Sequence, residues 1–170
     1  MRKTVYVVSL LMGIGFAPIA CKNKSKAICV LEPTKGYNVQ GTLNLEAHDN
    51  DVQITGKITG LTPGTHGFHI HEFGDLSDPE GKSAGDHYNP QNHPHGSPDS
   101  SQHHSGDLGN IEANAQGIAE VNTKASGVTL DAIVGRSIIV HGDKDDLQSQ
   151  PSGNAGARAA VGIISTDKST

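Results

Sequence analysis

Short runs in which apolar and polar residues alternate follow one another along most of this 170-residue chain. In residues 39–47, for example, Val39, Leu43 and Leu45 fall on one side of an extended segment. Side chains alternate across a strand with period two, so this pattern predicts strands. The predicted strands are 27–31, 39–47, 52–58, 67–73, 108–113, 118–122, 128–130, 137–140 and 159–164. With no helical stripe, repeat or second domain, the chain is expected to fold as an all-β antiparallel sandwich or barrel.

Two long segments between the predicted strands carry no periodic pattern. The first, Asp75 to Gly106, is rich in Gly, Pro, Ser, Asp and His, and the second runs from His141 to Arg158. Long structureless loops are uncommon in compact domains and are usually functional. Eight of the ten histidines fall between His66 and His104, a density that a globular surface does not need. We therefore expect the chemistry of this chain to lie in and beside these loops.

The first residues are typical of an export signal. Arg2 and Lys3 precede the apolar run 5–16, and the small residues of 17–20 precede a cysteine. The apolar run is shorter than the roughly 20 residues that a transmembrane helix needs. We therefore predict an export signal over 1–20, a polar tether over 21–26 and one folded domain over 27–170.

Cys21, directly after Ala20, resembles the acylated cysteine of a bacterial lipoprotein box, although Pro18 stands where such boxes usually carry Leu. Cleavage by ordinary signal peptidase, without a lipid, is the alternative. We expect a periplasmic or cell-envelope protein that is lipid-anchored at Cys21. Removal of residues 1–20 leaves 13 − 2 = 11 basic and 18 acidic side chains, a net charge of −7. This balance argues against general nucleic-acid binding.

The chain has two cysteines, Cys21 and Cys29. If Cys21 is acylated or removed, Cys29 has no partner, so no internal disulfide is expected. Cys29 lies in the apolar run 27–31 and is interpreted as a small buried hydrophobe rather than a reactive thiol.

Several histidines have the spacing of metal ligands. On a strand, His69 and His71 point to the same face, while Ile70 points to the core. Imidazole pairs suit copper, zinc, iron or nickel. In the first loop, three histidines are followed by a carboxylate, a donor set that suits tetrahedral zinc; they are His87, His95, His104 and Asp107. His141, at the end of a later strand, could add a further nitrogen to the first pair.

Together these residues resemble the copper/zinc superoxide dismutase family over nearly all of residues 27–165. The spacings of 8, 9 and 3 residues along the second set match the zinc loop of that family. The blocks that carry the resemblance are 67–75 (GFHIHEFGD), 83–90 (SAGDHYNP), 106–110 (GDLGN), 140–141 (VH) and 153–158 (GNAGAR).

The resemblance implies an eight-stranded Greek-key barrel with two functional loops, and it implies two metal sites. The implied copper ligands are His69, His71, His87 and His141, and the implied zinc ligands are His87, His95, His104 and Asp107. His87 would bridge both metals as an imidazolate. Asp145 would link ligands of the two metals by hydrogen bonds, with Asp146 as its rival in register. Arg158 would be the cation over the copper channel.

The implied activity is dismutation of superoxide to oxygen and hydrogen peroxide, by alternate reduction and reoxidation of the copper ion. His87 and Arg158 are the implied catalytic residues, and zinc supports His87. One alternative is a catalytically silent relative that binds or delivers copper, against which the complete ligand set and Arg158 argue. Another is a copper-only relative, against which the zinc-type ligands argue.

Four histidines lie outside the implied ligand set. His93 and His103 are each adjacent or nearly adjacent to an implied ligand and remain rivals of His95 and His104. His66 matches a family histidine that bonds the backbone, so a structural role is expected, and His48 is expected on the surface.

The chain also departs from the family. The positions that match the family disulfide are Gly81 and Val161, so something else must hold the first loop, zinc above all. The second loop is shorter than in the animal enzymes, whose charged guidance residues are not assigned here. Since the animal-type dimer uses the disulfide-bearing loop, a homodimer of that type is not assured.

Overall fold

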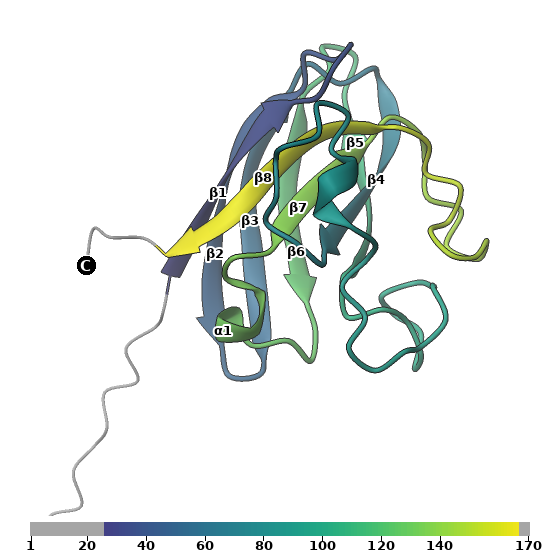
Figure 1. Cartoon of the computed structure of the whole chain (residues 1–170). Coiled ribbons are helices and arrows are strands. Elements are labelled where there is room, and N and C mark those ends of the chain that lie inside the picture. Colours follow the sequence, from purple (N-terminus) through teal and green to yellow (C-terminus); the bar gives the residue numbers. More distant parts are fainter. Residues whose placement is uncertain (1–25, 167–170) are drawn as a thin grey trace, which may run out of the picture.

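The structure, a computed structural model, describes residues 26–166. Eight antiparallel strands form one sheet in the order β5-β4-β7-β8-β1-β2-β3-β6 (Figure 1). The end strands, β5 and β6, lie side by side, so the sheet forms a nearly closed barrel. The strands are β1 (Lys26–Pro33), β2 (Gln40–His48), β3 (Asp51–Thr59), β4 (Gly64–His71), β5 (Asp107–Ala113), β6 (Ala119–Ala125), β7 (Ser137–His141) and β8 (Arg158–Thr166). The all-β prediction is confirmed, and non-consecutive neighbours such as β4 and β7 give the Greek-key connections.

The predicted export signal, Cys21 and most of the predicted tether lie outside the described residues. Within residues 26–166, no helix is long and apolar enough to cross a membrane.

The alternating residues that predicted the strands fill the barrel. Leu43 and Leu45 of β2 pack with Ile54 and Ile58 of β3 in the core, where all four are almost fully buried. Burial of such a side chain contributes about 1.5–3 kcal/mol to stability. Cys29 of β1 lies in the same core as a free, fully buried cysteine, as the sequence predicted. Burial raises the pKa of its thiol to about 12.

Two predictions about local structure were wrong. Residues 128–130 form no strand, because Leu130 begins the short helix α1 (Leu130–Ile133). Leu130 and Ile133, three residues apart, both bury their side chains in the core, which suits a helical turn. The predicted strand 67–73 begins earlier and ends earlier, as β4 (Gly64–His71), and the first loop contains one turn of 3₁₀-helix, η1 (Lys82–Ala84).

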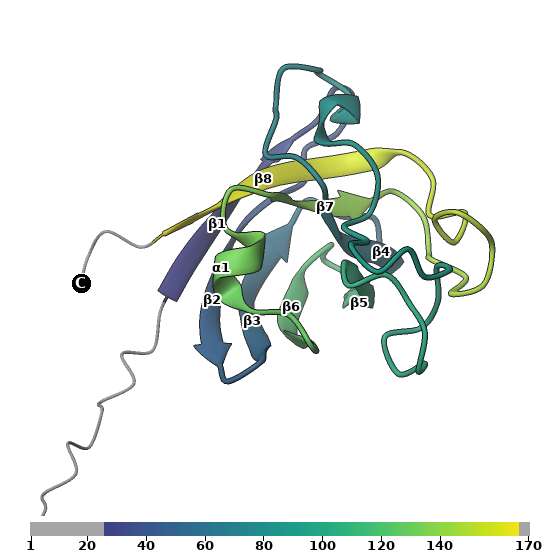
Figure 2. The same cartoon turned by 60° about the horizontal axis from the view of Figure 1, so that its bottom comes forward.

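Strand β4 positions two of the candidate metal ligands, His69 and His71. Phe68 and Ile70 point into the barrel core and are fully buried there, so His69 and His71 project from the opposite face of the strand. The first loop and the second loop, residues 142–157, leave the barrel beside β4. Figure 2 shows residues 88–106 and the second loop on the same side of the barrel, next to β4 and β5. The outward histidines therefore lie between the barrel wall and the loops.

Candidate metal centre

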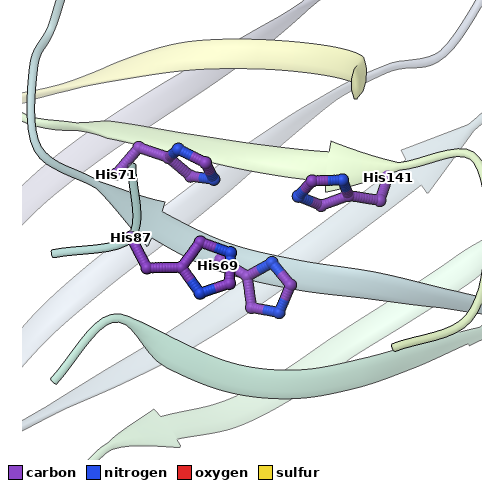
Figure 3. Close-up of side chains that lie close together, drawn as sticks. All are labelled: His69, His71, His87 and His141. Carbon is purple, nitrogen blue, oxygen red and sulfur yellow. The ribbon is translucent and has the colours of Figure 1, made fainter. Parts of the chain in front are cut away.

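Four histidine rings from three parts of the chain form one buried group (Figure 3). His69 and His71 come from β4, His141 is the last residue of β7, and His87 is in the first loop. The His87 ring centroid lies 3.9 Å from that of His69 and 5.0 Å from that of His71, while His141 lies 4.9 Å from His69. Each offers a ligand atom within 4.8 Å of the others, so the group could hold a metal ion.

Backbone pairing brings His87 to this group. His87 forms an isolated antiparallel bridge with His71, and the next residue, Tyr88, donates its N–H to the carbonyl of Ile70 at 2.8 Å. Gly106 packs against the same stretch, and a Cβ there would lie 2.2 Å from the Ile70 oxygen. Only glycine fits this close approach of two backbones.

The fit of this group to a metal can be tested on its nitrogen atoms. Within residues 26–166, one buried nitrogen of each ring has no hydrogen-bond partner; the four atoms are His69 Nδ1, His71 Nε2, His87 Nε2 and His141 Nε2. Buried polar atoms are nearly always paired, so four unpaired nitrogens in one group require an explanation. A metal ion that accepts all four would satisfy them, and imidazole nitrogen is a donor that copper accepts.

Hydrogen bonds fix the orientation of three of these rings. His71 donates from Nδ1 to the Gly85 carbonyl at 3.0 Å, and His141 donates from Nδ1 to the Gly156 carbonyl at 3.2 Å. His69 donates from Nε2 to Asp145 at 2.7 Å. Because the bonded nitrogen of each ring keeps the proton, the other nitrogen is free to bind a metal.

Burial also keeps these rings neutral near pH 7. Loss of hydration lowers the pKa of His69 to about 4 and that of His141 to about 3. The pKa of His71 is held well below its usual value for the same reason. A neutral imidazole is the form that ligates a metal.

A second group lies on the other side of His87 and contains His95, His104 and Asp107. Asp107 Oδ1 lies 2.8 Å from His87 Nδ1, 3.0 Å from His95 Nδ1 and 3.4 Å from His104 Nδ1. Burial alone would raise the pKa of Asp107, but the three imidazole contacts outweigh it and hold that pKa far below its usual range. Three nitrogens and one carboxylate oxygen match a tetrahedral zinc site.

His87 therefore faces both groups. Its Nδ1 points to Asp107, while its Nε2 is one of the unpaired nitrogens of the first group. The structure brings together every implied ligand of each metal, and it places His93 and His103 in neither group. His103 instead donates from Nδ1 to the carbonyl of His104 at 2.7 Å.

Asp145 connects the two groups from the second loop. Its carboxylate contacts His69 Nε2 at 2.7 Å and His95 Nε2 at 3.0 Å, and the residue is fully buried. These two imidazole contacts outweigh the effect of burial and lower its pKa. The rival Asp146 accepts hydrogen bonds from the backbone of the second loop instead.

Glycine at position 153 makes room for this connection. Gly153 has a φ of +67°, and a Cβ there would lie 1.7 Å from Asp145 Oδ1 and 2.7 Å from His95 Nε2. Sequence reasoning missed Asn110, whose side-chain amide exchanges two 2.9 Å hydrogen bonds with the backbone of Asp145. Its place in the 106–110 block was the available signal.

The remaining histidines have other surroundings. His66 is buried, and its Nδ1 lies 2.9 Å from the carbonyl oxygen of His141, which agrees with the expected structural role. His48 lies 3.9 Å from Glu46, and its side chain is 45% exposed.

Arg158 lies beside a cavity of about 360 Å³ that opens onto the first group and is also lined by His71, His87 and His141. Its guanidinium donates Nη2 to the Gly85 carbonyl at 2.6 Å and Nη1 to the Gly81 carbonyl. Both bonds hold the side chain against the first loop with its charge beside the cavity.

The two positions that match the family disulfide have different partners here. Gly81 accepts the bond from Arg158, and Val161 packs with Ala84 and Ile139 in a small apolar cluster. The cluster joins η1 to strands β7 and β8.

The profile of the family described as copper/zinc superoxide dismutase matches residues 39–164. The chain is 44% identical to the extracellular Cu-Zn superoxide dismutase of Brugia pahangi, over 81% of this chain and 74% of that protein. It is 45% identical to Cu-Zn superoxide dismutase 5 of Dictyostelium discoideum, over 84% of this chain and 98% of that protein. Both the donor sets and these similarities lead to the same assignment: the chain belongs to the copper/zinc superoxide dismutase family, whose enzymes use copper and zinc to act on superoxide.

Proposed function

We propose that this protein dismutes superoxide at a paired centre in which the four-histidine group holds copper and the histidine–aspartate group holds zinc. The copper ligands would be His69, His71, His87 and His141, and the zinc ligands would be His87, His95, His104 and Asp107. The observation that carries the assignment is the set of four buried, unpaired nitrogens directed into one group, with the opposite side of His87 facing Asp107.

When bound, copper supplies one-electron chemistry, taking an electron from one superoxide and giving it to a second, while zinc supplies a fixed charge without redox chemistry. The sum is two superoxide ions and two protons to one oxygen and one hydrogen peroxide. The part of His87, a residue that lines the cavity, is to hold a proton at Nε2 when that atom is not a ligand. Contact of Nδ1 with the second group keeps the ring in place meanwhile.

The part of Arg158 is to attract and orient the anion. The chain has a net charge of −5, so an approaching anion needs a local positive field. Arg158 is half-buried, and its two bonds to loop carbonyls fix the guanidinium beside the cavity. Asp145 acts by orientation, since it holds the ring of His69 and the ring of His95 at once.

Metal analysis of the purified protein, combined with a superoxide-decay assay, tests this proposal. About one copper and one zinc per chain with fast decay are expected. Full copper loading without decay would instead identify a catalytically silent copper-binding relative, and copper without zinc would identify a copper-only enzyme.

We also propose that the protein is exported, with an export signal over 1–20, lipid attachment at Cys21 and a folded domain over 27–170, in the periplasm or cell envelope. The apolar run before Cys21 and the similarity to a dismutase named as extracellular support export. Fractionation of the native host tests the anchor, because Cys21→Ser should move the protein from the membrane to the soluble fraction. Equal membrane association of both forms would leave secretion without a lipid.

A further inference from the structure

Gln150, in the second loop, makes a two-point contact with the backbone of His95. Its Oε1 accepts the N–H of His95 at 2.8 Å, and its Nε2 donates to the carbonyl of His95 at 2.9 Å. The same Nε2 donates to the carbonyl of Gln148 at 3.1 Å, which ties the amide to its own loop. Neither the family resemblance nor the sequence pattern assigned a role to this residue.

His95 is the residue at which the two loops meet. Besides Gln150, the second loop supplies Asp145, whose carboxylate contacts His95 Nε2 at 3.0 Å. Next to these contacts the loops separate, and a groove of about 730 Å³ lies between segments 94–102 and 146–150. The second loop therefore holds His95 by its main chain and by its ring, and Gln150 supplies the main-chain part.

We propose that Gln150 is a positioning residue for the zinc site. By fixing the backbone of His95, it sets the place from which His95 Nδ1 reaches Asp107, 3.0 Å away. This inference rests on the proposed role of His95 as a zinc ligand. Partners that orient a metal ligand typically change metal affinity about 10–100-fold when they are lost.

The contacts of Gln150 also make the effect selective. Three rings of the four-histidine group are oriented by Gly85, Gly156 and Asp145, none of which bonds to Gln150. The fourth ring, that of His87, is shared by the two groups and contacts Asp107. Loss of the Gln150 amide should therefore weaken zinc binding and leave copper binding unchanged.

The test uses the protein loaded with both metals and compares Gln150→Ala with Gln148→Ala. Gln148 is a matched control, because it lies in the same loop and its side chain makes no hydrogen bond within residues 26–166. The readouts are release of zinc and copper to a chromogenic chelator and the visible spectrum of Co(II) placed in the zinc site. Gln150→Ala should release zinc about 10-fold faster than the wild type and change the Co(II) spectrum, while Gln148→Ala matches the wild type.

Gln150→Glu refines the test, because a carboxylate still accepts the N–H of His95 but cannot donate to its carbonyl. Zinc release from this variant should be intermediate. Equal zinc release from Gln150→Ala and Gln148→Ala would overturn the proposal. So would a parallel rise in copper release, or an equal loss of melting temperature with and without metals, because either result would mean a general structural role. Superoxide decay by the wild type is a separate measurement, so failure of the proposed function would be recognised independently.

Discussion

In the structure the first loop spans residues 72–106, between β4 and β5, and its two halves are held to the molecule in different ways. In the anchored half, residues 72–87, Glu72 donates its N–H to the Asp86 carbonyl at 2.9 Å, and Phe73 donates to the Ala84 carbonyl at 3.0 Å. Ala84 is fully buried against Val161 and Ile139. These are backbone bonds and apolar contacts, the same interactions that hold the barrel.

In the ligand half, residues 88–106, backbone bonds to Ile70 hold the two ends, Tyr88 and Gly106. Between these ends, the contacts with Asp107 and with the second loop converge on candidate ligands. His95 and His104 meet Asp107, and His95 also meets Asp145 and Gln150 of the second loop. Such contacts place several polar groups close together, so a metal at their centre should contribute much of their stability. We therefore expect apolar packing and Arg158 to hold the anchored half, where the family has a disulfide, and bound zinc to hold the ligand half.

The largest effect is expected at His87, where the two halves meet. His87→Ala removes a donor from both groups at once, so activity should fall by at least about 100-fold and zinc should bind more weakly. Superoxide decay and zinc titration measure the two losses. His93→Ala is the matched control, because His93 lies in the same loop but in neither group. Equal activity of His87→Ala and the control would show that His87 is not the bridge.

A smaller effect is expected from Arg158, which should serve both the reaction and the anchored half. Arg158→Glu should lower the reaction rate about 10-fold or more at low ionic strength. The difference should shrink with added salt, because screening acts over about 8–10 Å at moderate ionic strength.

Arg158→Lys separates the two roles. It keeps the charge, but it cannot reproduce the forked contact with the carbonyls of Gly81 and Gly85. Most of the salt-dependent rate should remain, while hydrogen exchange in 81–85 accelerates. Equal reaction rates for Arg158→Glu, Arg158→Lys and the wild type at low salt would contradict the steering role.

The difference between local and distant signals explains what the sequence could predict. Alternation along β2 and β3 is a local pattern, so most strands could be found in advance. The spacing from His87 to Asp107 is also local, but the complete donor sets, with His141 in the first group, were implied by the family resemblance. Residues 128–130 were misassigned because a short apolar run suits either a strand or a buried helical turn.

The supporting contacts have no such local signal. Gln150 and His95 are 55 positions apart, and glutamine in a polar loop has many uses. Asp145 and Asp146 are adjacent carboxylates, and only the fold of the second loop places Asp145 between two imidazole rings. Likewise, no local sequence pattern predicts that Ala84 packs against Val161, at the place where the family has a disulfide.

Selective removal of zinc tests the comparison directly. Metal that binds only the folded form stabilises it by mass action, and its removal should destabilise first the part that it holds. Hydrogen exchange should therefore accelerate in 88–106, while 72–87 exchanges at nearly its original rate. Equal acceleration in both halves would show that zinc holds the whole loop and that the Ala84 cluster adds little.

The smallest effect is expected from thiol reductant, because the anchored half has no disulfide to lose. In a Cys21→Ser background, Cys29 is the sole thiol. A non-chelating phosphine at pH 7 should leave melting temperature and activity unchanged. A large loss would reveal an intermolecular disulfide through Cys29, and thus an exposed thiol.

The pH dependence of stability checks the burial of Cys29 independently. Its pKa is about 12 in the folded protein against an ordinary value of 9.0. Between these values the unfolded chain loses the thiol proton while the folded chain keeps it. The contribution of the thiol to stability is therefore fully present below pH 9 and declines as the pH rises toward 12. Urea unfolding measures this contribution. Between pH 8 and pH 10, the free energy of unfolding should fall by about 1.4 kcal/mol more for the wild type than for Cys29→Ala. The comparison with Cys29→Ala cancels the titration of lysines and tyrosines, so equal losses in the two proteins would mean that the Cys29 thiol ionises freely in the folded state.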